Sequence, residues 1–113
     1  MKENIIDQKL LIAEIGTGDA ANAAVEYAMT RLTYLVCGVI RGIEERDASQ
    51  IDEYGSQLKK LASSLYAERM TSLVDDILHL AARRLFHDLS DCLVVLLAMN
   101  KTLSQELSSL TPN

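Results

Sequence analysis

The sequence predicts an all-α protein, an antiparallel helical bundle of four or five helices in a single domain that spans residues 1–113. Apolar residues recur at intervals of three and four residues through most of the chain, as on one face of an α-helix. The chain contains one proline, Pro112, and only five glycines, so few residues would interrupt a helix. No segment alternates apolar and polar residues as a half-buried strand does.

Composition narrows the possible partners and the location of the protein. About half of the residues are hydrophobic (49%), so a chain of 113 residues can form one core without disulfides or a structural metal. The net charge of −5 argues against nucleic acid and anionic membrane surfaces, because both attract clustered Lys and Arg. The longest apolar run, Cys92–Met99, is far shorter than the roughly 18 residues of a membrane span. We therefore expect no nucleic-acid partner and no membrane segment.

The two cysteines, Cys37 and Cys92, each lie within an apolar run. A thiol in such surroundings behaves as a small hydrophobic group. We expect both to be reduced core residues, which is typical of a cytoplasmic protein.

The first half of the chain predicts two helices. The first covers residues 4–15 and ends at Gly16-Thr17-Gly18, after which Asp19 suits the first turn of the next helix. The second covers residues 20–46. Its apolar face consists of Val25, Ala28, Leu32, Leu35, Val39 and Ile43.

The second half predicts one amphipathic helix and a longer apolar segment. Asp47 and Gln50 have the spacing of a capping box, in which the side chain of each residue accepts a hydrogen bond from the backbone N–H of the other. The helix that follows carries the stripe Ile51, Tyr54, Leu58, Leu61 and Leu65. Ser72 to Asp75 can cap a further helix. Whether residues 73–110 form one helix, or two with a break near residues 88–91, stays open.

The segment Cys92–Met99 is apolar around the whole helix circumference. The three or four other helices of a small bundle can cover only part of such a segment. We therefore expect a homodimer that buries this surface, including Leu93 and Leu97. In the alternative, the segment is the central helix of a monomer.

Residues 83–103 resemble the H box of the dimerisation helices of histidine kinases and of histidine phosphotransferases. The matching residues are His87, Asp88, Leu89, Leu93, Leu96 and Ala98. The resemblance implies that His87 accepts a phosphoryl group and that Asp88 orients it or takes its proton. A neutral imidazole beside a carboxylate is suited to this chemistry.

A structural role also accounts for the same region. Asp75, His79, Arg83, His87 and Asp91 follow one another at intervals of four residues. On one continuous helix they would form a solvated ladder of ion pairs. Such a ladder requires no function.

Asp76 and His79 have the spacing of two metal ligands on one helix face, but a bundle site needs a second such pair from a facing helix. The sequence offers no second pair. We expect neither a metal site nor a cofactor.

Two further features are candidate partner-binding sites. Gly38 and Gly42 lie four residues apart in an expected helix, where with Tyr34 they mark a narrow face that another helix could approach. Glu44 and Glu45 add acidic charge near the next turn, where a basic surface of a partner could dock.

Taken together, these features favour a small cytoplasmic regulatory or adaptor protein that acts by helix-mediated binding to another protein. Antiactivators, immunity proteins and chaperones are proteins of this kind. The alternative is a histidine phosphotransfer protein that uses His87 with Asp88.

Overall fold

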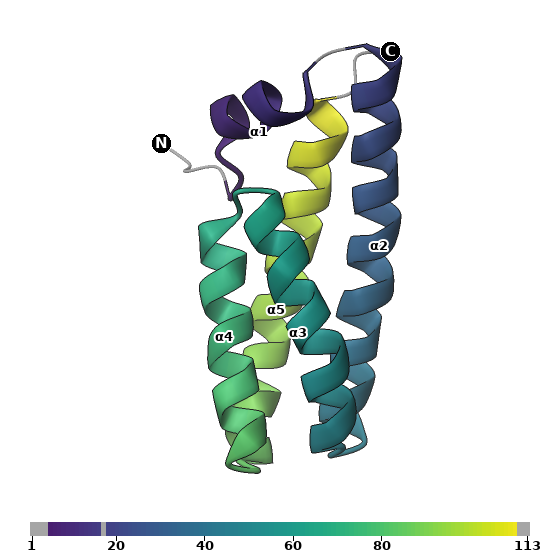
Figure 1. Ribbon diagram of the computed structural model, residues 1–113. Helices are drawn as coiled ribbons and strands as arrows, with labels where there is room; N and C mark the ends of the chain where they lie inside the picture. The colour runs from purple at the N-terminus through teal and green to yellow at the C-terminus, as the bar shows by residue number, and fades with distance from the viewer. Residues whose placement is uncertain (1–4, 17, 111–113) are drawn as a thin grey trace.

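The computed structural model describes residues 5–16 and 18–110, and these residues form five helices (Figure 1). The helices are α1 (Gln8–Ile15), α2 (Asp19–Glu44), α3 (Ala48–Ser64), α4 (Glu68–Ala82) and α5 (Phe86–Ser109). Within this described part the chain has no strand, so the all-α prediction is confirmed.

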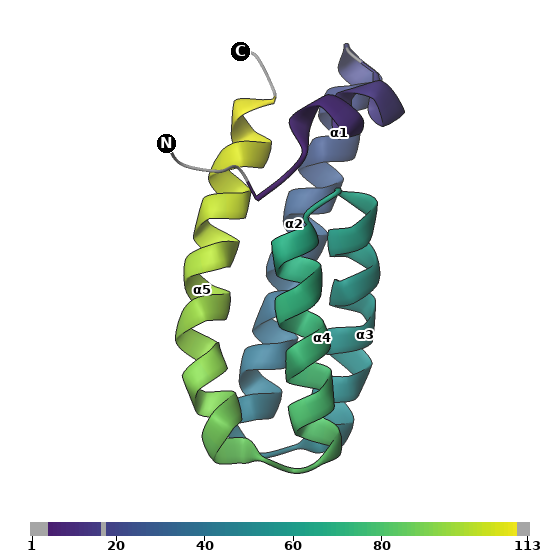
Figure 2. The same ribbon diagram turned by 90° about the vertical axis from the view of Figure 1, so that its left-hand side faces the viewer.

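The four long helices form an up-and-down bundle. Both α2 and α4 pack against α3 and α5, so each long helix has two neighbours. Figure 2 shows the neighbours running antiparallel, while α1 lies across the end of the bundle at which α5 finishes. The short α1 packs on α2. The molecule measures 44 × 29 × 20 Å along its principal axes.

One apolar face of each long helix builds the core. The core face of α5 consists of Leu89, Leu96, Leu103 and Leu107, all completely buried. The face predicted for α2 is buried as well, with Leu32 and Val39 fully inaccessible. No polar or charged residue is buried in the described ranges, so the core is held by apolar packing.

The three corners between the long helices share one backbone geometry. Arg46, Tyr66 and Arg84 have φ of 55°, 56° and 56°, the left-handed conformation in which a helix commonly ends. At each corner the next N–H bonds a carbonyl five residues back, as Leu85 does to Leu80 at 3.0 Å. These bonds satisfy carbonyls at the helix ends, although a non-glycine residue adopts this conformation at some cost.

A segment before α1 is tied to the last helix. The Glu106 carboxylate accepts hydrogen bonds from the backbone N–H groups of Ile5 (3.0 Å) and Ile6 (3.1 Å). Both isoleucine side chains are buried. The N–H of Asp7 bonds the Tyr66 carbonyl at 3.1 Å, and the Asp7 side chain caps α1. Residues separated by almost the whole chain thus close one end of the bundle.

Several predicted boundaries are wrong in detail. The helix α1 begins at Gln8, after its Asp7 cap, and Asn4 lies outside the described residues. The helix α4 begins at Glu68, so Ser72 lies inside it and does not cap it. The left-handed Tyr66 corner sets this start at residue 68, five residues before the predicted residue 73.

The apolar segment of residues 73–110 forms two helices. The chain turns after Ala82 and resumes as a helix at Phe86, so the break precedes the region near residues 88–91. The left-handed Arg84 makes this turn without glycine or proline, which is why residue type gave no sign of it.

The capping box at the start of α3 is half right. Asp47 Oδ1 accepts from the Gln50 N–H at 3.1 Å, as predicted. The Gln50 side chain instead donates to the Gly38 carbonyl of α2 at 3.0 Å. The glutamine therefore joins α3 to α2.

By length and composition, α2 is the one helix in the described ranges that could cross a membrane. A core helix of a bundle meets the same criteria, and here the apolar face of α2 is packed inside the protein.

Candidate functional site

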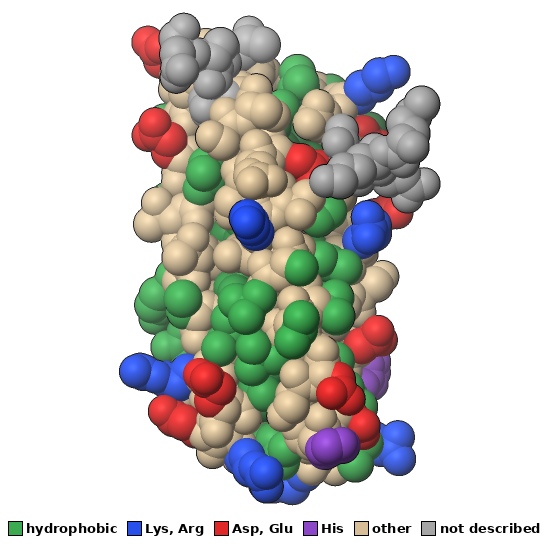
Figure 3. Space-filling model, turned by 180° about the vertical axis from the view of Figure 1, so that it is seen from behind, with side chains coloured by type: hydrophobic (Ala, Val, Ile, Leu, Met, Phe, Trp, Pro, Cys, Tyr) green, Lys and Arg blue, Asp and Glu red, His purple; other side chains and the backbone are tan. Residues whose placement is uncertain are grey.

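The outer face of α5 exposes a cluster of apolar side chains. The exposed fractions are 70% for Val94, 45% for Val95 and 46% for Leu97, and Ala98 is exposed beside them. Figure 3 shows hydrophobic side chains gathered across the middle of this side of the molecule, with most charged groups toward its ends. Contiguous apolar surface of this kind marks contact sites more often than scattered single residues do.

The packing of α5 explains why these residues face solvent. Leu89, Leu96 and Leu103 recur every seventh residue and occupy the core, while only α2 and α4 flank the helix. Because residues 92–99 are apolar on all sides, those opposite Leu96 cannot reach the core. Of the two sequence-predicted residues here, Leu97 is exposed and Leu93 is partly buried against the core.

Polar residues continue the outer face of α5 beyond the apolar cluster. His87 and Asp91 lie toward its N-terminal end, and Lys101 and Gln105 toward its C-terminal end; all four are exposed. The apolar cluster therefore has an acidic group at one end and a basic group at the other.

A second exposed surface lies where α2 meets α3. Tyr34 is 54% exposed, and its ring centroid is 5.6 Å from that of Tyr54. The two hydroxyls are 3.3 Å apart, and this hydrogen bond raises the pKa of Tyr54. The Arg31 guanidinium lies 5.4 Å from the Tyr34 ring, a cation–π contact. Tyr54 packs against the core, as its place in the apolar stripe of α3 indicated, but nothing in the sequence indicated its contact with Tyr34.

The glycines of α2 serve packing within the chain. A Cβ at Gly38 would overlap the Tyr54 ring, and one at Gly42 would lie 2.8 Å from Ile51 Cγ1. The helix that closely approaches Gly38 and Gly42 is thus α3 of the same protein. An external partner at this edge would meet Tyr34 and its neighbours instead.

The acidic corner after α2 is exposed but already holds basic groups. Glu44 and Glu45 are both exposed, and Glu45 lies 3.7 Å from Arg41. Because this pair is exposed on both sides, it contributes little to stability. The corner can still present acidic charge to a partner.

His87 and Asp88 are exposed in the first turn of α5, just after the Arg84 corner. The helix break separates them from α4, so the predicted five-residue ladder is not continuous. Its first step does exist: His79 Nδ1 lies 2.9 Å from the Asp75 carbonyl oxygen and 3.6 Å from Asp75 Oδ2.

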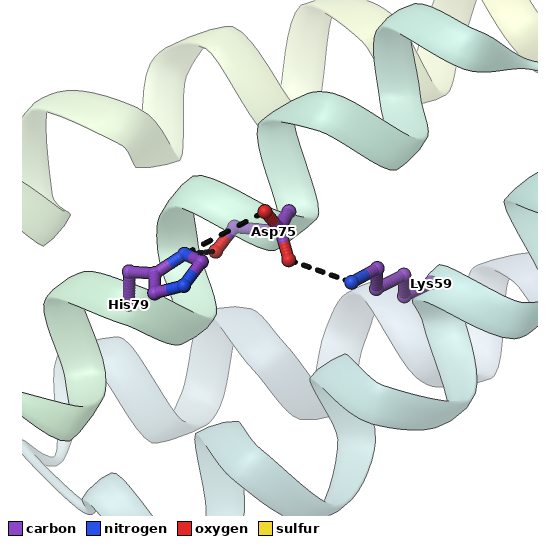
Figure 4. A network of polar contacts seen from close by, with 3 residues as sticks. All are labelled: Lys59, Asp75 and His79. Carbon is purple, nitrogen blue, oxygen red and sulfur yellow. Dashed lines mark hydrogen bonds and ion pairs between the residues drawn. The ribbon is translucent and has the colours of Figure 1, made fainter.

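Asp75 also joins α4 to α3. Lys59 Nζ donates to Asp75 Oδ1 at 2.6 Å, and this hydrogen bond lowers the pKa of Asp75 (Figure 4). His79 contacts the same carboxylate from the next turn of α4 (Figure 4). The histidine that contacts the Asp75 carboxylate is therefore His79, whereas His87 lies on another helix.

Of the two cysteines that were expected in the core, Cys92 packs against it and Cys37 does not. Cys37 is exposed on α2, so its assignment to the core is wrong; Val36 takes the inward position beside it. Cys92 is partly buried, and burial, followed by the nearby Asp76, raises the pKa of its thiol. Neither cysteine forms a disulfide.

In residues 5–16 and 18–110 no group of three or more His, Cys, Asp or Glu is placed to hold a metal ion. Asp76 and His79 are both exposed on α4.

The comparisons with known proteins give no relative: the chain matches no protein-family model, no curated protein and no solved structure.

Proposed function

We propose that this protein is a small cytoplasmic regulatory or adaptor protein that acts by helix-mediated protein–protein binding. The supporting observation is the exposed apolar cluster on α5, formed by Val94, Val95, Leu97 and Ala98. The bundle core is complete without these side chains, since the core leucines of α5 are fully buried. Their exposure is unfavourable in water, and a protein partner that covers them recovers this free energy.

The edge between α2 and α3 is the second contact surface that we propose. Tyrosine and arginine are enriched at binding hot spots, and Tyr34, Tyr54 and Arg31 lie together here. The adjacent Glu44 and Glu45 favour a partner with basic charge. An antiactivator, an immunity protein or a chaperone would use such surfaces.

Photo-crosslinking in cells tests the α5 surface. A photoreactive amino acid at Val94 should give protein adducts, whereas the same group at the exposed Asp52 of α3, diagonally across the bundle, should give few. An adduct with twice the mass of the chain identifies a second copy, and an adduct with any other mass identifies a different protein. Equal labelling at both positions, or none at Val94, would refute the proposal.

Histidine phosphotransfer is the second candidate function. It is supported by the exposure of His87, which leaves its ring accessible to the active site of a receiver domain. In the transfer, an imidazole nitrogen attacks phosphorus, the bond to the receiver's aspartate breaks, and the ring proton passes to Asp88 or water. The aspartate leaves as a carboxylate.

The test uses a receiver phosphorylated on aspartate as the donor. His87→Ala should abolish an acid-labile phosphoryl group on this chain, while His79→Ala, on α4, should leave it unchanged. Equal transfer to the parent and to His87→Ala would exclude this function.

A further inference from the structure

We infer that the partner of the α5 outer face is a second copy of this chain, bound with its α5 antiparallel. This inference rests on the proposed function, because it names the occupant of the same surface. It is carried by the order of exposed residues along α5 and by their charge.

The outer face of α5 carries a regular stripe. Its members are His87, Asp91, Val94, Ala98, Lys101 and Gln105, all of them exposed. They follow at alternating steps of four and three residues, which is the repeat of a helix that packs along another helix. This stripe lies opposite the core stripe of Leu89, Leu96 and Leu103. The helix therefore has two packing faces, of which the bundle uses one.

The stripe is symmetric about its centre. Val94 and Ala98 are equally far from Leu96, as are Asp91 and Lys101 on either side. A two-fold axis at the level of Leu96 therefore places Val94 against Ala98 of the partner subunit. The same axis places Asp91 opposite Lys101 of the partner subunit, and the reverse pair follows by symmetry.

Charge selects this orientation over the parallel one. In a parallel pair every residue lies opposite its own copy, so Asp91 and Lys101 would each meet a like charge. In the antiparallel pair both contacts are attractive. Within the described ranges neither Asp91 nor Lys101 forms an ion pair in its own chain, so both are available.

The apolar residues supply the centre of the contact. Val94, which is 70% exposed, lies on the midline of the stripe, and Val95 and Leu97 flank this midline on opposite sides. Burial of these side chains drives association, and the charged pairs at both ends fix the register. A shift by one helical repeat would leave half of the apolar cluster uncovered.

Charge reversal tests the register. Light scattering and sedimentation across a dilution series should show a dimer for the parent. Asp91→Lys and Lys101→Asp should each weaken it roughly tenfold or more, because two attractions become repulsions. The double variant, with both changes in one chain, should restore the parent affinity to within a few fold. Asp52→Lys and Lys60→Asp on α3 make the same changes in net charge as controls and should leave the dimer unchanged.

The outcomes separate this inference from the proposed function. A monomeric parent, or single reversals with no effect, would overturn the antiparallel dimer; the latter result is the one expected of a parallel pair. Val94→Asp should be monomeric by light scattering. It should also keep the helical circular dichroism of the parent, since Val94 is not a core residue. If the parent is monomeric but crosslinking at Val94 captures a different protein, the dimer fails and the binding function stands.

Discussion

The hydrogen bonds between Glu106 and the segment before α1 give a sharp test of how the bundle end is closed. Glu106→Gln removes the charge and leaves one carbonyl acceptor in place of two carboxylate oxygens. The N–H of either Ile5 or Ile6 then faces an amide NH₂, which cannot accept. One hydrogen bond is lost in a partly buried place and the other loses its ionic character.

The cost follows from these two changes. A hydrogen bond to a charged group contributes about 1.5–3 kcal/mol and a neutral one about 1 kcal/mol, so the two changes together cost about 2–5 kcal/mol. We take the lower end, about 2 kcal/mol, because the loss of a negative charge near the end of α5 offsets part of the cost. At about 1.4 kcal/mol for each factor of ten, this cost raises the equilibrium constant for detachment of the segment before α1 roughly thirtyfold. The effect of the helix dipole has the opposite sign, because removal of a negative charge near the end of α5 favours that helix.

The loss should be local, because α1 packs on α2 alone among the helices. Amide hydrogen exchange should show about thirtyfold less protection at Ile5, Ile6 and the buried Leu11, with Leu96 in α5 unchanged. Glu26→Gln, which makes the same change of charge at an exposed position of α2, should leave all of these rates as in the parent. Protection of Ile5 and Ile6 within twofold of the parent in Glu106→Gln would refute the reasoning.

Three other predictions follow from the packing and the titrating groups. Because the pKa of Asp75 is lowered in the folded protein, its contribution to stability is complete above its ordinary value of 3.8 and is lost as the pH falls through the lowered pKa. Asp75→Asn should therefore reduce the free energy of unfolding at neutral pH, and the difference from the parent should disappear in acid. Denaturant titrations above and below the lowered pKa measure this difference, and a difference that does not change with pH would contradict the prediction. Gly42→Ala should lower the free energy of unfolding by about 1 kcal/mol. Overpacking costs about 1–3 kcal/mol, and the higher helix propensity of alanine offsets about 1 kcal/mol of this cost. Its new Cβ would lie 3.1 Å from the Ile51 nitrogen as well, and urea unfolding that showed equal or greater stability would dispute the close approach. Iodoacetamide should label Cys37 well before Cys92, because burial raises the Cys92 pKa and limits access; mass spectrometry that found equal rates would oppose this.

Local sequence signals were reliable where one residue type determines the backbone. Gly16 and Gly18 adopt positive φ of 76° and 95° between α1 and α2, as the turn required. Asp47 caps α3 as predicted. The apolar stripe of α3 also faces inward as its spacing indicated, with Ile51 and Leu58 fully buried.

The corners were not predictable in this way. Arg46, Tyr66 and Arg84 take the left-handed conformation without being glycine. Their residue types carry no turn signal, because the carbonyl hydrogen bonds and the packing of the next helix impose the geometry. The predicted ladder through Arg83 failed for the same reason, since it assumed one continuous helix.

The sequence by itself determined the helical class and the inward face of each long helix, because both follow from the spacing of apolar residues along the chain. It also indicated that residues 92–99 hold more apolar surface than one helix face can bury. Only the tertiary structure decided which of these residues stay exposed. That choice depends on where α2 and α4 pack against α5, and contacts between helices distant in sequence leave no periodic signal in any one of them.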